Sequence, residues 1–230
     1  MNALHPRSNK TNRSPYFYRI FNDIANNSVL DFGGNQGNLL HFVEEIDESK
    51  YTCIDVNLSS LESGAKEFPK AKWIHYNKYN WAYHHEGNFN EPFPVVPKHD
   101  YVYAYSVFSH TSLDDFYQSL KYFISRANKK VAVSFLSTDD YPVINWFYEK
   151  RIKDYGTCID IRDYVTSDYN SVYFMDNNIQ VFNQEVYGKH DVRFFLALYN
   201  KKYLIEYLAD RGIAAMIDHE GDVPFLVITI

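Results

Sequence analysis

The fold is decided by the stretch Val29-Leu30-Asp31-Phe32-Gly33-Gly34-Asn35-Gln36-Gly37-Asn38-Leu39. An apolar run ends in an acidic residue, a glycine-rich segment follows, and an apolar pattern with helical spacing begins after it. This order predicts a strand over residues 28–32, a tight turn, and a helix from Gly37 to about Ile46. A helix N-terminus offers unpaired backbone N–H groups to small charged ligands, and glycine allows their close approach. The turn is therefore typical of a cofactor-binding loop.

The spacing of the glycines distinguishes among nucleotide-binding loops. The dinucleotide fingerprint Gly-x-Gly-x-x-Gly needs a glycine where Phe32 stands, although Gly34 and Gly37 fit its last two positions. A P-loop needs Lys and Ser or Thr directly after its last glycine, and the chain lacks them after Gly37. The pattern that fits is acidic-x-Gly-x-x-x-Gly, supplied by Asp31, Gly33 and Gly37.

This pattern resembles the first motif of the class I methyltransferases that use S-adenosylmethionine. The family often has glycine at the middle position, where this chain has Asn35. The resemblance implies an α/β fold of Rossmann-like type: a seven-stranded, mostly parallel sheet with an antiparallel C-terminal strand and helices on both faces. It covers residues 29–136 and, weakly, the C-terminal end of the chain.

A second strand is predicted over residues 51–57, and it carries the acidic residue Asp55. Asp55 follows the glycine loop by about 20 residues, where a carboxylate accepts hydrogen bonds from the ribose hydroxyls. The alternative is that Asp55 only caps the helix that begins near Ser59 or Ser60. The order of strand, loop and acid favours the ribose role.

A third strand is predicted over residues 71–77. Family members usually place an acid near the position of Asn77, where it receives the adenine amino group. The side-chain carbonyl of Asn77 can accept the same hydrogen bond. The continuation through residue 83 is similar to a stretch seen in small-molecule members of the family.

The fourth predicted strand begins at Asp100 and ends in Ser-Val-Phe-Ser-His, residues 106–110. A helix follows, with Ser112 as its expected N-cap and Asp115 as the capping-box partner. Its expected buried face consists of Phe116, Leu120, Phe123 and Ile124. The sequence Ser-Val-Phe-Ser-His, followed by the acidic start of this helix, is again similar to the class I methyltransferases.

The resemblance assigns site residues position by position. The implied cofactor-binding residues are Asp31, Gly33, Gly34, Asn35, Gly37, Asp55, Val56, Asn57, Asn77, Ser106 and Val107. The glycine loop is expected at the methionine part of the cofactor, with Asp31 near its amino group. Val56 or Asn57 is expected to flank the adenine ring. Ser106 and Val107 are expected beside the methyl-bearing sulfur.

Methyl transfer needs an aligned nucleophile, exclusion of water and, for a weakly acidic acceptor, a base. His110 follows the fourth strand and can titrate near neutrality, so it is the candidate catalytic residue. Its ring can equally hold the next helix or contact the cofactor, and a carboxylate acceptor needs no base. No metal site is expected, because nothing completes a ligand set around His84, His85 and Glu86.

The chain is expected to divide into four segments. Residues 1–27 form an N-terminal helical cap, and residues 28–136 form the cofactor-binding half of the sheet, with a fifth strand over 130–136. Residues 137–199 interrupt the alternation with an aromatic-rich insertion that contains a small hairpin. Residues 200–230 add a helix closed by Gly212 and two strands that complete the sheet. The insertion is interpreted as a substrate lid; the alternative is a packed subdomain or a homodimer surface.

Composition limits the class of protein. The chain has 230 residues and a formal net charge of −6, which disfavours a broad phosphate-binding surface. Two cysteines, Cys53 and Cys158, are too few for a disulfide framework or a zinc ribbon. Residues 1–14 lack the apolar region of a signal peptide, and no run has the length of a membrane span. We therefore expect a soluble, cytoplasmic protein without nucleic-acid or membrane partners.

The expected function is S-adenosylmethionine-dependent methyl transfer to an oxygen or nitrogen of a small molecule or short peptide, as in natural-product biosynthesis. The fourth strand lacks the Asn/Asp-Pro-Pro-Tyr/Phe motif that related enzymes use on nucleobase and glutamine amino groups. Two alternatives stay open. A non-catalytic S-adenosylmethionine-binding or scaffold protein would be expected to lose residues such as Asp31 and Gly33, which are intact. A nicotinamide-dependent oxidoreductase would need the glycine that Phe32 replaces.

Overall fold

The computed structural model describes residues 14–80, 83–111, 113–137, 171–175, 178–182, 194–220 and 223–230. The chain forms two compact units. The first unit comprises the described residues of Met1–Tyr105, Leu120–Val133 and Ile228–Ile230. The second unit comprises those of Ser106–Ser119 and Ser134–Val227.

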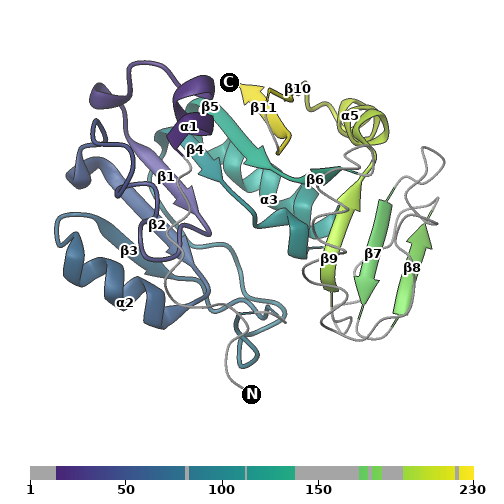
Figure 1. Cartoon of the computed structure of the whole chain (residues 1–230), viewed down its shortest axis with the longest axis horizontal. Helices are drawn as coiled ribbons and strands as arrows, with labels where there is room; N and C mark the ends of the chain where they lie inside the picture. The colour runs from purple at the N-terminus through teal and green to yellow at the C-terminus, as the bar shows by residue number, and fades with distance from the viewer. Residues whose placement is uncertain are drawn as a thin grey trace. The chain divides into compact units, whose positions relative to one another are not determined.

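A seven-stranded sheet has the strand order β10-β11-β5-β4-β1-β2-β3 (Figure 1). Its strands are β1 (Val29–Phe32), β2 (Tyr51–Asp55), β3 (Lys72–His75), β4 (His99–Ala104), β5 (Ala127–Ser134), β10 (Met216–Asp218) and β11 (Phe225–Thr229). The pairings β1–β2, β1–β4, β2–β3 and β4–β5 are parallel, and β10 pairs with β11 antiparallel. This confirms the expected fold class. Strands β1 and β4 are almost continuously buried because both faces of a parallel sheet are covered.

Successive residues of β1 point to opposite faces of the sheet. On one face, the ring of Phe32 packs against that of Phe123 from α3 (Leu113–Arg126), with 5.0 Å between ring centroids. On the other face, Phe17 of α1 (Ser14–Ile20) lies edge-on to Tyr103 of β4 at 5.3 Å. Phe116, Leu120 and Phe123 of α3 are fully buried, as its apolar spacing predicts, and Ile124 is half-buried.

Helix α2 (Leu58–Glu67) packs on β3 through a single large side chain. A Cβ at Gly64 would stand 2.3 Å from the ring of Trp73, so only glycine lets the helix approach this closely. The Trp73 Nε1–H donates a 3.2 Å hydrogen bond to the carbonyl of Phe68 directly after the helix. Figure 1 shows α2 running beside β2 and β3.

The N-terminal helix is shorter than its apolar spacing suggests. It ends at Ile20, and a short 3₁₀ turn, Ile24–Asn26, follows. Asp23 between them has φ 51°, and its side chain accepts a 2.9 Å hydrogen bond from Asn26. Asn and Asp side chains offer the backbone such local alternatives to a helix. Phe17, Ile20, Phe21 and Ile24 are nevertheless buried.

Residues 37–46 do not form the expected helix; they form a series of turns. The carbonyl of Leu39 accepts hydrogen bonds from the N–H groups of both Phe42 (3.1 Å) and Val43 (3.0 Å). The regular hydrogen bonds of an α-helix therefore do not continue through the segment. Gly37 has φ 79°, outside the helical region. The segment contains weak helix formers, and its C-terminal end is acidic, which opposes the helix dipole. Burial of the apolar side chains occurs without the helix.

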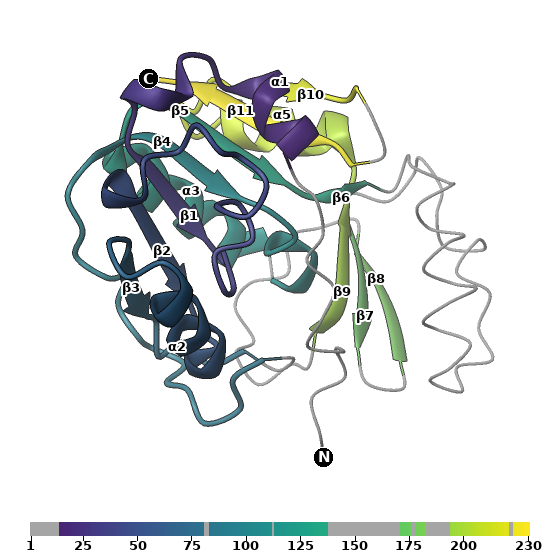
Figure 2. The ribbon, with the colours of Figure 1, turned by 60° about the vertical axis from the view of Figure 1, so that its left-hand side comes forward.

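The second unit contains a four-stranded sheet in the order β6-β9-β7-β8 (Figure 2). Its strands are β6 (Leu136–Ser137), β7 (Ser171–Met175), β8 (Asn178–Phe182) and β9 (Phe194–Tyr199). Strands β7 and β8 are antiparallel with Val172 opposite Val181, which confirms the expected strand pair. Strand β9 was not predicted, and it pairs parallel with β6 and antiparallel with β7. Most of the aromatic residues that suggested a lid lie outside the described residues.

The C-terminal helix α5 (Lys201–Ala209) ends as predicted. Gly212 has φ 77°, and the N–H of Ile213 reaches back to the carbonyl of Leu208 at 2.9 Å. This hydrogen bond satisfies a carbonyl at the helix end, as in a Schellman motif. None of the helices in the described part of the chain combines the length and apolar composition that a membrane span needs.

Candidate cofactor site

Asp31 lies on β1, two residues before Gly33, the first glycine of the loop. Its side chain is fully buried, and its Oδ2 accepts a 2.6 Å hydrogen bond from the hydroxyl of Tyr51. A Cβ at Gly34 would stand 2.6 Å from the same Oδ2 and 2.8 Å from Sγ of Cys53. No other residue fits at position 34, because real Cβ atoms do not approach other atoms this closely. The loop therefore packs directly against the buried carboxylate of Asp31 at Gly34.

The loop backbone turns through three left-handed residues. Gly33 has φ 75°, Asn35 φ 58° and Gly37 φ 79°. Glycine adopts this conformation without penalty, and Asn tolerates it better than most residues. This conformational requirement accounts for the two glycines and for Asn35 at the position where the family often has glycine.

Asp55 joins the end of β2 to the glycine loop. Its Oδ2 accepts a 2.8 Å hydrogen bond from the backbone N–H of Asn35, and its Oδ1 accepts one of 2.8 Å from Asn57. The side chain that caps α2 is that of Asn57, whose Oδ1 accepts from the N–H of Ser60 at 3.2 Å. Asp55 is thus not the cap of this helix. A carboxylate offers about four acceptor positions, so Asp55 keeps acceptor capacity for further donors.

The residues expected near the adenine ring follow β2 and β3. Val56 and Asn57 are half-buried, whereas Asn77 is exposed. Nε2 of His84 lies 2.8 Å from Oδ1 of Asn77, and Nε2 of His75 lies 3.1 Å from the carbonyl of Val56. The two histidine rings lie 5.2 Å apart. The oxygen that we expect to meet adenine therefore already has one partner, His84.

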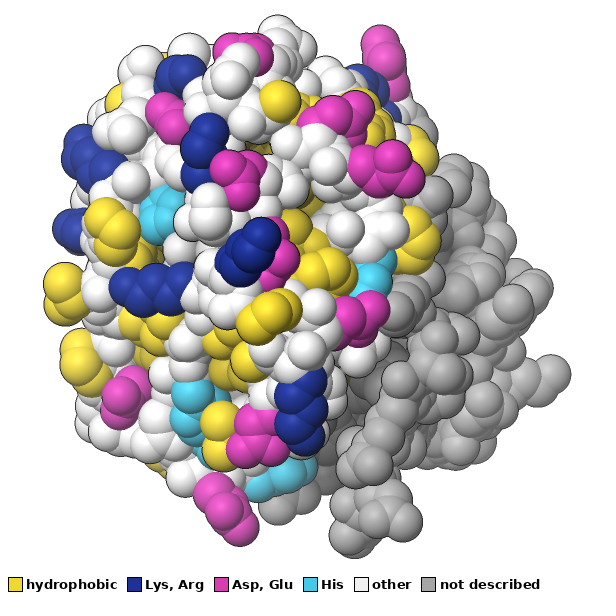
Figure 3. Space-filling view, turned by 90° about the vertical axis from the view of Figure 1, so that its left-hand side faces the viewer, with side chains coloured by type: hydrophobic (Ala, Val, Ile, Leu, Met, Phe, Trp, Pro, Cys, Tyr) yellow, Lys and Arg dark blue, Asp and Glu magenta, His cyan; other side chains and the backbone are white. Residues whose placement is uncertain are grey.

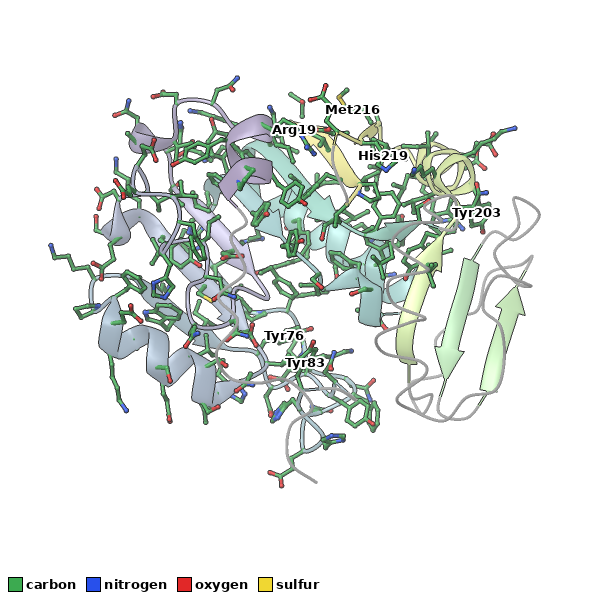
Figure 4. The ribbon with its side chains drawn as sticks, in the orientation of Figure 1. Arg19, Tyr76, Tyr83, Tyr203, Met216 and His219 are labelled. Atoms are coloured by element: carbon green, nitrogen blue, oxygen red, sulfur yellow. The ribbon has the colours of Figure 1, made fainter. Side chains whose placement is uncertain are left out.

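The loop after β3 is anchored to the strand that it follows. Figure 4 shows Tyr76 directly after β3 and Tyr83 further along the loop. The Tyr76 hydroxyl donates to the carbonyl of Glu91 at 3.2 Å, and its ring stacks on Phe93. The N–H of Asn88 donates a 2.7 Å hydrogen bond to the carbonyl of Asn77. These contacts hold Asn77 at the end of the strand.

The remaining predicted residues belong to the second unit. Ser106 is exposed and has φ 59°, Val107 is half-buried, and His110 is the last residue of a 3₁₀ turn, Phe108–His110. The N–H of Ser106 donates a 2.7 Å hydrogen bond to Oγ of Ser134. The expected N-cap Ser112 lies outside the described residues.

The charges around the loop affect Cys53. Burial, followed by the negative charges of Asp31 and Asp55, raises the pKa of the Cys53 thiol well above its ordinary value. The thiol therefore stays protonated and acts as a small packing group. Burial also lowers the pKa of His84. No group of three or more His, Cys, Asp or Glu side chains in the described residues is arranged to hold a metal ion.

These residues fit S-adenosylmethionine. Gly33, Gly34 and Gly37 carry no side chains, so the backbone of the loop can approach a ligand closely. Within the described chain, the N–H of Gln36 has no acceptor, while that of Asn35 is held by Asp55. The loop would hold the methionine part, and the spare acceptor positions of Asp55 suit ribose hydroxyls.

Sequence reasoning missed Tyr51 and Trp73. Cys53 pairs with Asp31 across β1 and β2, and residues two apart in a strand share a face, so Tyr51 lies on the face of Asp31. Trp73 pairs with Cys53 and fills the space beside Gly37, where a Cβ would stand 2.8 Å from its ring. The strand register could have indicated this shared face, but register is not evident within any single strand.

Residues 30–129 match the family model of a methyltransferase domain. No curated protein sequence matches the chain significantly.

Solved structures resemble the fold at low identity. DesVI of Streptomyces venezuelae is 12% identical, with a TM-score of 0.55, over 95% of this chain and 90% of its own. The PH0226 protein of Pyrococcus horikoshii OT3 is 14% identical, with a TM-score of 0.54, over 95% and 87%. The glycopeptide N-methyltransferase MtfA, solved with S-adenosyl-L-homocysteine, is 10% identical, with a TM-score of 0.53, over 97% and 91%.

At these identities the structures show the fold, and the family model shows the domain. Residues 30–129 therefore match a methyltransferase domain, and the chain has the Rossmann-like fold of the class I methyltransferases.

Proposed function

We propose that the protein is an S-adenosylmethionine-dependent methyltransferase that transfers the methyl group to an oxygen or nitrogen of a small molecule or short peptide. The observation that carries the proposal is the charge of the chain, −6, together with its distribution. On the face shown in Figure 3, Lys and Arg side chains are interspersed with Asp and Glu and form no continuous basic field. Binding of a nucleic-acid acceptor would need clustered positive charge.

The cofactor-binding roles are part of the proposal. Asp31 orders the glycine loop, Asp55 receives the ribose hydroxyls, and Asn77 meets the adenine edge. Support comes from the buried Asp31–Tyr51 hydrogen bond and from the two N–H bonds by which Asp55 holds the loop and the start of α2. The remaining contacts are assigned to Val56 or Asn57 at the adenine faces, and to Ser106 and Val107 near the sulfur.

The chemistry follows from what bound S-adenosylmethionine supplies, an electrophilic methyl group on a sulfonium. The protein's own task is to align the acceptor, exclude water and take up a proton where the acceptor is weakly acidic. His110 is the proposed base, because it follows the fourth strand and its ordinary pKa lies near neutrality. The segment 137–199 is proposed to contribute acceptor-binding residues, because it is inserted after the fifth strand and is rich in aromatic side chains.

We also propose that the enzyme acts in the cytoplasm. The chain has two cysteines, and Cys53 is buried as a free thiol. Thiols persist in reducing compartments.

Calorimetric titration with S-adenosylmethionine, S-adenosylhomocysteine and NAD tests the site. We expect binding of the two sulfur compounds with Kd values on the order of micromolar, and no binding of NAD. Absence of binding to both sulfur compounds would favour a scaffold protein.

A second experiment tests the acceptor class. Incubation with methyl-labelled S-adenosylmethionine and pools of amino sugars, phenols, short peptides and transfer RNA should label a small acceptor. Labelling of the RNA alone would overturn the proposal. His110→Ala should lower turnover while leaving the Kd of S-adenosylhomocysteine unchanged. A loss of affinity with unchanged turnover would instead place His110 in the cofactor site.

A further inference from the structure

Ser106 has a backbone conformation that serine rarely adopts. Its φ is 59°, in the left-handed region, and the residue is not glycine. L-residues are disfavoured there because Cβ approaches the carbonyl oxygen. Such conformations persist only when the surroundings hold them, and they concentrate at functional sites. The conformation of Ser106 therefore indicates a functional position, and the contacts that hold it are relevant to that function.

Two buried hydroxyl groups hold the Ser106 backbone. Its N–H donates a 2.7 Å hydrogen bond to Oγ of Ser134, and its carbonyl accepts from Oγ of Ser109 at 3.3 Å. Ser134 is 1% exposed and Ser109 is 3% exposed. The backbone N–H and carbonyl of Ser106 are thus both hydrogen-bonded to buried serine side chains, which come from two separate segments of the second unit.

The side chain of Ser106 is exposed, in contrast to its backbone. The residue directly follows β4, at the carboxyl end of a parallel strand, where ligands bind in open α/β sheets. A negative φ would turn the peptide and redirect this hydroxyl. The buried hydroxyl groups therefore determine where the exposed one points.

We propose that Ser134 is a positioning residue that holds Ser106 in its left-handed conformation, with Ser109 as the weaker second contact. This inference rests on the proposed role of Ser106 at the cofactor. Ser134 acts through the Ser106 peptide and not by touching the ligand. The bond between them offsets the cost of the left-handed backbone.

The test combines Ser134→Ala with Ser106→Gly, because glycine adopts a positive φ without support. Ser134→Ala should weaken binding of S-adenosylhomocysteine about tenfold, the factor that corresponds to the usual cost of a left-handed residue. In the Ser106→Gly background the same substitution should change the Kd less than about twofold. Ser134→Thr keeps the hydroxyl and should bind like the wild type.

Ser119→Ala is the matched control, since it removes another buried serine hydroxyl of the second unit, on α3. It should leave the affinity for S-adenosylhomocysteine unchanged even if it lowers the melting temperature. A crystal structure of Ser134→Ala should show Ser106 with a negative φ.

Failure of the Ser134 positioning role and failure of the proposed cofactor site give different results. If the wild type binds S-adenosylhomocysteine and Ser134→Ala weakens it equally with serine or glycine at 106, the positioning role is wrong. A Ser106 that keeps its positive φ in Ser134→Ala would also overturn it. Failure of the wild type to bind at all would overturn the cofactor site itself, and this inference with it.

Discussion

The hydroxyl of Tyr51 on β2 donates a 2.6 Å hydrogen bond to the carboxylate of Asp31 on β1. Both side chains are buried, and the neighbouring Gly34 leaves no space for a Cβ beside this carboxylate. A contact between two adjacent parallel strands thus sets the position of the acid that orders the cofactor loop. Tyr51 is for this reason the first residue to test outside the recognised motif.

Tyr51→Phe removes the hydroxyl and leaves a buried carboxylate oxygen without that donor. We expect a loss of about 1–3 kcal/mol in the free energy of unfolding, the usual cost of such a change. We also expect weaker binding of S-adenosylhomocysteine, because the loop is no longer fixed. Urea unfolding and calorimetric titration measure the two effects.

Tyr199→Phe is the control for this prediction. Tyr199 is equally buried, but its hydroxyl donates to the carbonyl of Thr111 in the second unit, at 2.7 Å. It should lower stability without changing cofactor affinity. Equal affinity losses in both variants would show that the effect of Tyr51 is not specific to the loop.

Gly34→Ala places a Cβ 2.6 Å from Oδ2 of Asp31 and 2.8 Å from Sγ of Cys53. We expect destabilisation of about 1–3 kcal/mol from overpacking and a loss of cofactor affinity of about tenfold or more. Gly212→Ala is the control, because its cost comes from φ 77° alone, with no atom within 4 Å of the added Cβ. Only the first variant should affect the Kd of S-adenosylhomocysteine, and an unchanged Kd would contradict the role of the loop.

Asp55→Ala removes the acceptor of two backbone N–H groups, those of Asn35 and Asn57. If the carboxylate also binds the ribose, the affinity for S-adenosylhomocysteine should fall about tenfold to a hundredfold. Asp47→Ala removes a carboxylate that, within the described residues, accepts hydrogen bonds from Ser49 alone, and it should leave the affinity unchanged. A change in melting temperature without a change in affinity for Asp55→Ala would exclude the ribose role.

His99 makes stability depend on pH. Burial lowers the pKa of His99 below its ordinary value of 6.5. The unfolded chain therefore binds a proton at higher pH than the folded chain, so this stabilisation is present above pH 6.5 and is lost as the pH falls below it. The wild type should lose more stability between about pH 7.5 and pH 5.5 than His99→Gln does, by urea unfolding. Parallel curves would show that His99 does not cause the loss.

Several elements were predictable because their signals are local. The apolar runs of β1, β2 and β4, the amphipathic spacing of α3 and the glycine after α5 each depend on residues close in the sequence. One exception is the segment 37–46, whose apolar residues are buried by a series of turns. The apolar spacing of this segment indicates which side chains are buried. It does not ensure a regular helix, which the weak helix formers and the acidic C-terminal end of the segment disfavour.

By itself, the sequence determined the alternation of strands and helices, the glycine loop that follows Asp31, and the position of Asp55 at the end of the second strand. Tertiary structure decided the partners: Tyr51 on Asp31, Trp73 against Gly37 and Ser134 on Ser106. Each of these contacts joins two segments that are distant in the chain, and strand register and packing decide which side chains meet. A local motif specifies the backbone that binds the cofactor, and only the packed sheet supplies the side chains that hold this backbone in place.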